Sequence, residues 1–147
     1  PLEASYVVLS WDRDFNYEKL NDAYQAFVRG AIVIATNPDR TCPLEDGQIP
    51  DTGAMIGALE GATGLPIHII AGKPSMITAE MAVQHLGLDY AACYMVGDRL
   101  ETDIKMANDT GMNSVLVLTG ITNRQMLEDT PYEPKYVIDS IKEIGNV

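Results

Sequence analysis

The stretch YMVGDRLETDI, residues 94–104, decides how the rest of the sequence is interpreted. An apolar run ends at Gly97, and two acids, Asp98 and Asp103, follow on either side of the insert Arg-Leu-Glu-Thr. Ligands of open α/β sheets bind beyond the carboxyl ends of the strands. Carboxylate oxygens suit Mg²⁺, which keeps several waters and takes only one or two protein carboxylates. The stretch therefore predicts a divalent-metal site at the end of a buried strand.

Short apolar runs alternate with helical patterns along the whole chain. Residues at helical spacing recur over 17–27, 55–62 and 77–85, and a glycine follows each helical segment where a left-handed C-cap prefers one. Runs this apolar are typical of strands buried on both faces, so we predict an α/β fold with a largely parallel sheet. The predicted strands are residues 6–9, 31–35, 67–70, 93–96, 114–118 and 136–138.

Two further segments carry specific expectations. Residues 38–51, PDRTCPLEDGQIPD, contain three prolines and a glycine, which predicts a long excursion rather than a regular element. Long excursions in α/β proteins often carry function. Thr122 and Gln125 have the spacing of a capping box, which predicts a helix over residues 123–128.

A lysine follows the predicted strand 67–70, in the sequence AGKPS. If that strand neighbours the strand 93–96, the ammonium of Lys73 converges with the carboxylates of Asp98 and Asp103. Such an ammonium can neutralise a transferring phosphoryl group. Asp103 also lies in the first turn of a predicted helix over residues 102–110, where capping explains an acid equally well.

These motifs resemble a known family. GKPS followed by MVGDRLETDI resembles the third and fourth motifs of the haloacid dehalogenase superfamily, whose members are mostly Mg²⁺-dependent phosphatases. Residues 12–20, DRDFNYEKL, and residues 35–64 look like the second half of the α/β cap in the NagD-like, 4-nitrophenylphosphatase branch. The resemblance implies the C-terminal half of such an enzyme. Residues 1–64 would be half of the cap, and residues 65–147 the C-terminal half of a Rossmann-like core.

The resemblance also implies roles for the residues after the strands. In the family an Asp nucleophile attacks phosphorus and a second Asp protonates the leaving group. Asp98 matches the acid that binds Mg²⁺. Lys73 matches the lysine that steadies the nucleophile and the phosphate, and Asp103 matches the second acid of the fourth motif. All three are candidate catalytic residues.

The cap loop of the family faces the substrate, and its counterpart here is residues 36–43. Asn37, Asp39, Cys42 and Pro43 are therefore candidate substrate-binding residues. Asn-Pro-Asp is equally a good turn, and Cys42 is equally explained as a small buried hydrophobe. The implied substrate is a small phosphorylated metabolite of the nucleotide, sugar phosphate, phosphoglycolate or pyridoxal phosphate type.

The first motif of the family, which holds the nucleophile, has only an imperfect counterpart. Asp12-Arg13-Asp14 follows a strand, but Phe15 stands where that motif has glycine, and a bulky ring blocks the required loop. We expect the nucleophile in a missing N-terminal part, so this chain alone should be inactive. The alternatives are a complete capless phosphatase that uses Asp12, and a non-enzymatic Mg²⁺-binding α/β module.

Composition limits the partners. The chain has 21 acidic and 10 basic residues and a net charge of −11, which argues against nucleic acid and anionic membranes. Its apolar runs are too short to span a bilayer, and two cysteines, Cys42 and Cys93, are too few for a disulfide scaffold. We expect a cytoplasmic protein. Relatives with this cap often pair through it, so a homodimer is a further expectation.

Overall fold

The computed structural model describes residues 3–147, which form two compact units, Pro1–Gly72 and Lys73–Val147. Both units combine helices with parallel strands, so the predicted α/β class is confirmed. The predicted boundary lay after residue 64, whereas the first unit continues to Gly72. It continues because the next strand pairs with a strand of the first unit. That these units correspond to a cap and a core stays a prediction.

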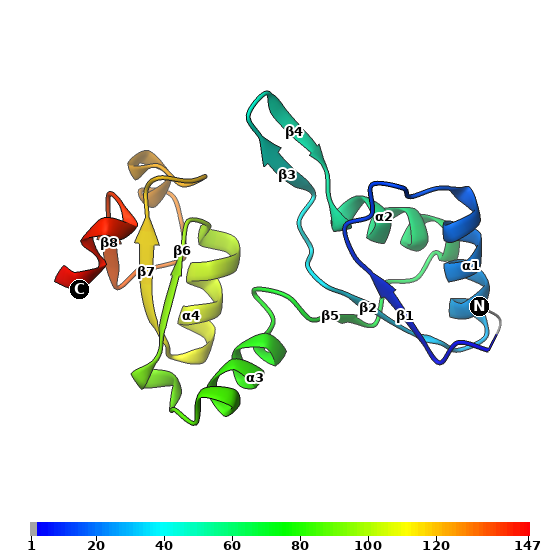
Figure 1. Cartoon of the computed structure of the whole chain (residues 1–147), viewed down its shortest axis with the longest axis horizontal. Helices are drawn as coiled ribbons and strands as arrows, with labels where there is room; N and C mark the ends of the chain where they lie inside the picture. Colours follow the sequence, from blue (N-terminus) through cyan, green and yellow to red (C-terminus); the bar gives the residue numbers. More distant parts are fainter. Residues whose placement is uncertain (1–2) are drawn as a thin grey trace. The chain divides into compact units, whose positions relative to one another are not determined.

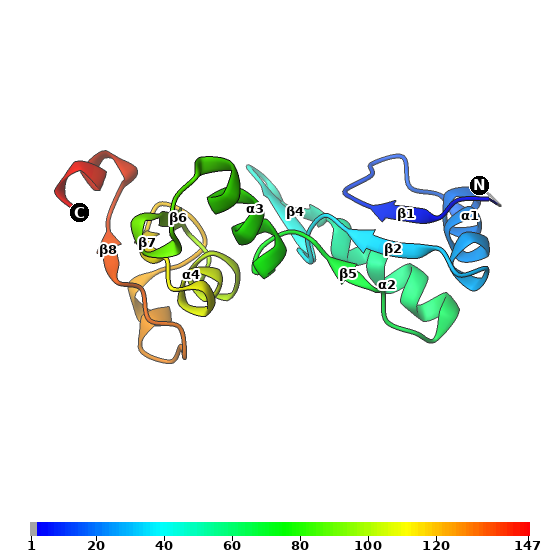
Figure 2. The same ribbon diagram turned by 90° about the horizontal axis from the view of Figure 1, so that it is seen from below.

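The first unit is built on a three-stranded parallel sheet of order β1-β2-β5, in which the strands lie side by side (Figure 2). Two helices contact each other and pack on one face of it. Asn16 caps the first helix and Asp51 caps the second, each by accepting a backbone N–H. The elements are β1 (Tyr6–Leu9), α1 (Tyr17–Val28), β2 (Ile32–Ala35), α2 (Thr52–Thr63) and β5 (Ile69–Ile70).

The core of the first unit lies between the sheet and these helices, and it contains Leu9, Val33 and Leu59. The strands were expected to be buried on both faces, and for β1 this is wrong. Tyr6 and Val8 are 62% and 63% exposed. The two helices cover only the face to which Leu9 points, so the alternate residues of this edge strand face solvent.

The expected irregular excursion 38–51 is instead mostly regular. It forms an antiparallel hairpin of β3 (Thr41–Leu44) and β4 (Gly47–Pro50). Proline is tolerated because both strands of a two-stranded ribbon are edge strands. A residue whose N–H would point away from the partner strand needs no N–H for the ladder, so proline can take its place. Gly47, with φ at 139°, supplies the backbone conformation that the tight turn needs.

The second unit contains a parallel sheet of order β6-β7-β8 (Figure 1). Helix α4 packs beside β6 and β7, and Leu100, Ile104 and Leu116 form a buried cluster. The elements are α3 (Met76–Leu86), η1 (Tyr90–Ala92), β6 (Tyr94–Gly97), the π-helical turn η2 (Leu100–Ile104), α4 (Lys105–Thr110), β7 (Asn113–Val117), η3 (Arg124–Leu127), β8 (Tyr136–Ile138) and η4 (Ile141–Asn146).

Two predictions about the second unit need correction. The convergence of Lys73 with the two acids was predicted on the condition that β5 and β6 are neighbours, but β5 pairs with β2 in the first unit and β6 pairs with β7 in the second. The helix predicted over 123–128 is a 3₁₀ turn, and its cap is Asn123, whose side chain accepts the Met126 N–H. Thr122 caps nothing, because its backbone N–H is engaged by Asp98 O and its side chain is buried.

Three of the four predicted glycine C-caps are confirmed, whereas the C-cap of α1 is Arg29 and Gly30 follows it. Gly64, Gly87 and Gly111 close α2, α3 and α4 with φ of 69°, 66° and 79°. None of the helices within residues 3–147 combines the length and apolar character needed to cross a bilayer.

The core assignment of the second unit predicts one stability effect. Leu116 is fully buried in β7, so Leu116→Ala should lower the free energy of unfolding by about 2–5 kcal/mol through lost burial and a residual cavity. Urea denaturation, with hydrogen exchange of β7 amides to assign the loss to this unit, measures it. Leu86→Ala is the control, because Leu86 is 61% exposed. Equal losses in the two variants would contradict the assignment.

Candidate functional site

The chain turns sharply after β6, and this turn brings Asp103 back to the end of the strand. The π-helical turn η2 follows Arg99, and the Asp103 N–H donates to Arg99 O at 3.0 Å. A Cβ added at Gly97 would overlap the Asp103 carboxylate. Gly97 thus allows the side chain of Asp103 to approach the backbone at the end of β6.

The carboxylate of Asp103 is buried and uses both of its oxygens. Its side chain is 2% exposed. Oδ1 lies 2.5 Å from Lys73 Nζ, and Oδ2 accepts the Arg99 N–H at 3.1 Å. Hydrogen bonds to an ionised group are about twice as strong as neutral ones, and a buried charge needs such partners. The sequence left a helix-terminus role and a role in the site as alternatives for Asp103, and the structure shows that it both engages the backbone N–H before η2 and pairs with Lys73.

Lys73 reaches Asp103 without the strand arrangement that was expected. It is the first residue of the second unit and lies shortly before α3, which Ser75 caps by accepting the Ile77 N–H. The side chain of Lys73 remains 49% exposed although its ammonium is fixed by the carboxylate. The structure therefore brings Lys73 and Asp103 together and presents a positive group that solvent, and hence a ligand, can reach.

Asp98 is held by the loop that follows β7. Its Oδ2 accepts the Ile121 N–H at 2.8 Å, and its backbone O accepts the Thr122 N–H at 3.2 Å. Asp98 is half-buried, and its Oδ1 has no hydrogen-bond partner among residues 3–147. Asp98 and Asp103 both follow β6, but only Asp98 keeps a carboxylate oxygen available for a ligand.

The sequence analysis missed the loop of residues 119–122. Gly120 and Ile121 contact Asp98, and neither was predicted as a site residue. A signal was present, because this loop follows the carboxyl end of a predicted strand, as the other site residues do. Residues just after the predicted strands 67–70 and 93–96 were considered as site residues, and those just after the strand 114–118 were not.

The candidate substrate-binding residues lie in the first unit. Asn37 Nδ2 donates to Thr52 Oγ1 at 3.1 Å, and Asn37 Oδ1 accepts the Asp39 N–H at 2.9 Å, which is the turn interpretation. Asp39 is half-buried, and its backbone O accepts the Gly53 N–H at 2.7 Å. Cys42 and Pro43 lie on β3, where Cys42 is only half-buried.

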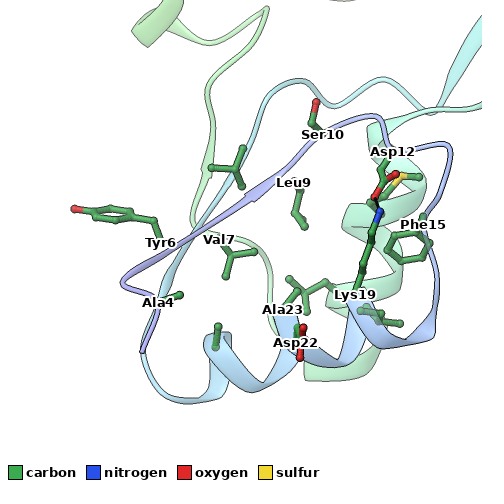
Figure 3. Close-up of a pocket in the computed structure, with 15 residues that line it drawn as sticks. Ala4, Tyr6, Val7, Leu9, Ser10, Asp12, Phe15, Lys19, Asp22 and Ala23 are labelled. Atoms are coloured by element: carbon green, nitrogen blue, oxygen red, sulfur yellow. Dashed lines mark hydrogen bonds and ion pairs between the residues drawn. The ribbon is translucent and has the colours of Figure 1, made fainter. Parts of the chain in front are cut away.

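A cavity of about 340 Å³ lies in the first unit, between β1 and the two helices. Figure 3 shows Lys19 of α1 extending to Asp12 beyond the end of β1, whereas Tyr6 points away from the helices. Lys19 Nζ lies 2.7 Å from Asp12 Oδ2, and the Asp14 N–H donates to Asp12 Oδ1 at 2.9 Å. Both oxygens of Asp12 are thus engaged in a turn and a surface ion pair. Lys73, Asp98 and Asp103 do not line this cavity.

The donor set after β6 suits a cation that needs few protein ligands. Within residues 3–147 no group of three or more His, Cys, Asp or Glu side chains could hold a metal ion together. Asp103 has both oxygens committed, and Asp98 offers one. Mg²⁺ commonly takes one or two carboxylates and completes its shell with waters and substrate phosphate oxygens, so this arrangement fits it.

Comparison with known proteins matches half of the chain to a family model. Residues 70–144 match the HAD-hydrolase-like family model. The chain is 43% identical over 144 residues to the sugar-phosphatase AraL of Bacillus subtilis, covering 98% of the chain and 52% of the relative. It is 39% identical over 141 residues to the 5′-nucleotidase YutF of the same organism, covering 95% of the chain and 54% of the relative.

A solved structure agrees over nearly the whole chain. The p-nitrophenyl phosphatase from Archaeoglobus fulgidus superposes with a TM-score of 0.91 at 42% identity, covering 98% of this chain and 57% of that one. The chain spans about half the length of the curated relatives that it matches. The predicted resemblance to haloacid dehalogenase-type phosphatases is confirmed.

The partner of the buried carboxylate predicts a stability effect. Lys73→Met should lower the free energy of unfolding by about 1–3 kcal/mol, because Asp103 then keeps a buried charge with one hydrogen bond fewer. The Lys73 side chain is half-exposed, so this loss of stability should be smaller than the loss for a fully buried ion pair. Urea unfolding measures it, with Lys142→Met as the exposed control. A loss no larger than that of the control would contradict the proposed buried pairing.

The environment of Asp12 predicts a pH effect. The Lys19 hydrogen bond, followed by the Asp14 N–H, lowers the pKa of Asp12 below its ordinary value of 3.8. A lowered pKa stabilises the fold above the unfolded-state pKa, and this is lost as the pH falls through the folded-state pKa. Carboxyl-carbon NMR titration should show this low pKa, and Lys19→Ala should raise it. Lys142→Ala should leave it unchanged, and an unshifted pKa in Lys19→Ala would refute the pairing.

Proposed function

Because the chain belongs to the HAD-hydrolase-like family, we propose that it forms part of a phosphatase that hydrolyses small phosphate monoesters with Mg²⁺. The observation that carries this proposal is the 2.5 Å contact between Lys73 Nζ and Asp103 Oδ1, which lies in the turn after β6 that also carries Asp98 with one free carboxylate oxygen. These three residues lie within the matched range 70–144. The printed activities of the relatives, sugar-phosphatase and p-nitrophenyl phosphatase, support the same reaction class.

Lys73 is the proposed phosphate-binding group. Its ammonium is fixed on one side by Asp103 while half of its side chain is exposed. A fixed cation needs little reorganisation when negative charge develops on a transferring phosphoryl group. In this proposal Asp103 does not touch the substrate, and it acts by holding Lys73 and the backbone of Arg99.

Asp98 is the proposed protein ligand of Mg²⁺, through its Oδ1. When bound, Mg²⁺ would polarise the phosphoryl oxygens and offset their charge. The donor chemistry supports this choice, because a single carboxylate oxygen leaves room for waters and for substrate oxygens. Asp98 also forms no ion pair with a cationic side chain among residues 3–147.

We propose that the nucleophile is an aspartate supplied by sequence outside this chain. Its carboxylate would attack phosphorus, the ester P–O bond would break, and a second acid would protonate the departing alcohol oxygen. Water would then hydrolyse the aspartyl-phosphate to free phosphate. Asp12 is a poor candidate for this role, because Lys19 and the Asp14 N–H already engage its oxygens and Phe15 replaces the expected glycine.

The proposed substrates are small phosphorylated metabolites, with sugar phosphates first because the sugar-phosphatase relative is 43% identical. Nucleotides, phosphoglycolate and pyridoxal phosphate are the other classes. Asn37, Asp39, Cys42 and Pro43 are proposed to select among them. Cys42 and Pro43 lie on a two-stranded hairpin, where side-chain changes disturb little of the core.

We further propose that the protein acts in the cytoplasm, binds neither nucleic acid nor membranes, and pairs as a homodimer. The net charge of −11 supports the first two partner statements. Its indispensable partner in this proposal is the polypeptide that carries the nucleophile.

The test is hydrolysis of 4-nitrophenyl phosphate with Mg²⁺. This chain alone should be silent, and activity should appear when it is coexpressed with the part of the Bacillus subtilis sugar-phosphatase that it does not match. Asp98→Asn should then lower the activity by at least about 100-fold, because a charged ligand at the transferring group is lost. Asp109→Asn is the matched control, since Asp109 pairs with Lys105 on the surface.

Two outcomes would replace this proposal. Turnover by the chain alone, abolished by Asp12→Asn, would establish a complete capless phosphatase. Asp98-dependent Mg²⁺ binding without activity in any combination would favour a non-enzymatic module.

A further inference from the structure

The loop after β7 lies against the side chain of Asp98, and only glycine fits at its closest point. A Cβ added at Gly120 would overlap Asp98 Oδ2 and would lie 2.5 Å from both Cβ and Cγ of Asp98. Non-bonded carbon atoms pack at about 3.5–4.0 Å, so Asp98 would have to move. Gly120 itself is exposed and has no positive φ, so the constraint is the neighbouring carboxylate and not the conformation of the glycine.

The same loop fixes Asp98 at two points. The Ile121 N–H donates to Oδ2 at 2.8 Å, and the Thr122 N–H donates to the backbone O at 3.2 Å. A backbone donor cannot follow a rotating carboxylate, so the first hydrogen bond selects one orientation of the group. The second holds the backbone from which the group extends. Together they leave Oδ1 as the oxygen without a partner among residues 3–147.

We propose that Gly120 and Ile121 are positioning residues for Asp98: they hold Oδ2 so that Oδ1 alone is presented to the divalent cation. This inference rests on the proposed function, because the cation is the one assigned there to Asp98. It goes beyond that function by naming the residues that set the orientation of the ligand and the number of oxygens it offers. Neither residue touches the substrate or the cation.

The arrangement also bears on how the cation is bound. The Ile121 N–H engages Oδ2, so the cation and the hydrogen bond do not compete for an oxygen when the cation binds Oδ1. A single carboxylate oxygen is a contact that suits Mg²⁺, which completes its shell with waters and substrate oxygens. Partners that orient a metal ligand typically change metal affinity by about 10–100-fold when they are removed.

The test uses the ¹⁵N-labelled 147-residue chain and two NMR readouts, neither of which needs turnover. Amide hydrogen exchange of Ile121 reports the hydrogen bond to Asp98. Line broadening by Mn²⁺, a paramagnetic substitute for Mg²⁺, reports metal binding at the amides of residues 97–99. The variant is Gly120→Ala, and the matched control is Gly57→Ala, where an added Cβ meets nothing within 4 Å.

In Gly120→Ala the Ile121 amide should exchange at least about tenfold faster than in wild type, and the Mn²⁺ concentration for half-maximal broadening should rise about 10–100-fold. Gly57→Ala should match wild type in both readouts. Wild-type exchange at Ile121 in folded Gly120→Ala would overturn the proposal. If Gly120→Ala does not fold, Asp98→Ala decides instead, because protection of Ile121 must then be lost, and its persistence would overturn the proposal.

The metal readout separates this inference from the proposed function. Mn²⁺ broadening that is absent in wild type, or unchanged in Asp98→Ala, would overturn the metal role of Asp98, and the Ile121 amide would still decide whether the loop holds the carboxylate. Broadening lost in Asp98→Ala but unchanged in Gly120→Ala would leave the metal role intact and overturn the positioning role.

Discussion

The carboxylate of Asp103 is the constraint on which the second unit depends. At 2% exposure it is a buried charge, which is tolerable only when its oxygens are paired. One oxygen takes the Lys73 ammonium and the other takes the Arg99 N–H, so a single group joins the first residue of the unit to the turn after β6. The turn can tighten this far because Gly97 has no side chain for the carboxylate to meet.

Local sequence patterns predicted where helices and strands lie along the chain better than they predicted which strands pair with each other. The strands Tyr6–Leu9 and Tyr136–Ile138 begin and end where the apolar runs do, and glycine closes α2, α3 and α4. Which sheet a strand joins is set by contacts distant in the sequence, so the pairing of β5 with β2 was not predictable from the run 67–70. The hairpin β3–β4 was missed because proline was weighed as a breaker, although a two-stranded ribbon has edges that accept it.

The sequence did not predict how the candidate site residues are connected. Lys73 and Asp103 do meet, yet through the segment before α3 and not through adjacent strands. A helix-terminus role and a role in the site were weighed as alternatives for Asp103, whereas its two oxygens allow one contact to the Arg99 N–H and another to Lys73. The position of Gly120 and Ile121 after a predicted strand was the only signal for them, because an absent Cβ and a backbone N–H are not reactive or charged side chains. Motif spacing identifies charged groups and says little about what orients them.

The two acids after β6 differ in whether a cationic side chain pairs with them among residues 3–147. Lys73 and Asp103 form a pair with no net charge, so the lysine attracts a phosphate less strongly than an isolated ammonium would. Asp98 adds a negative charge that has no cationic partner among residues 3–147, and two like charges about 4 Å apart repel by several kcal/mol at an effective dielectric of about 20. A phosphate dianion could not approach this carboxylate unless a divalent cation lay between them. In the proposed site, the free oxygen of Asp98 would therefore repel an anionic ligand that came alone and would bind it through a shared cation, so that metal and phosphate binding would depend on each other.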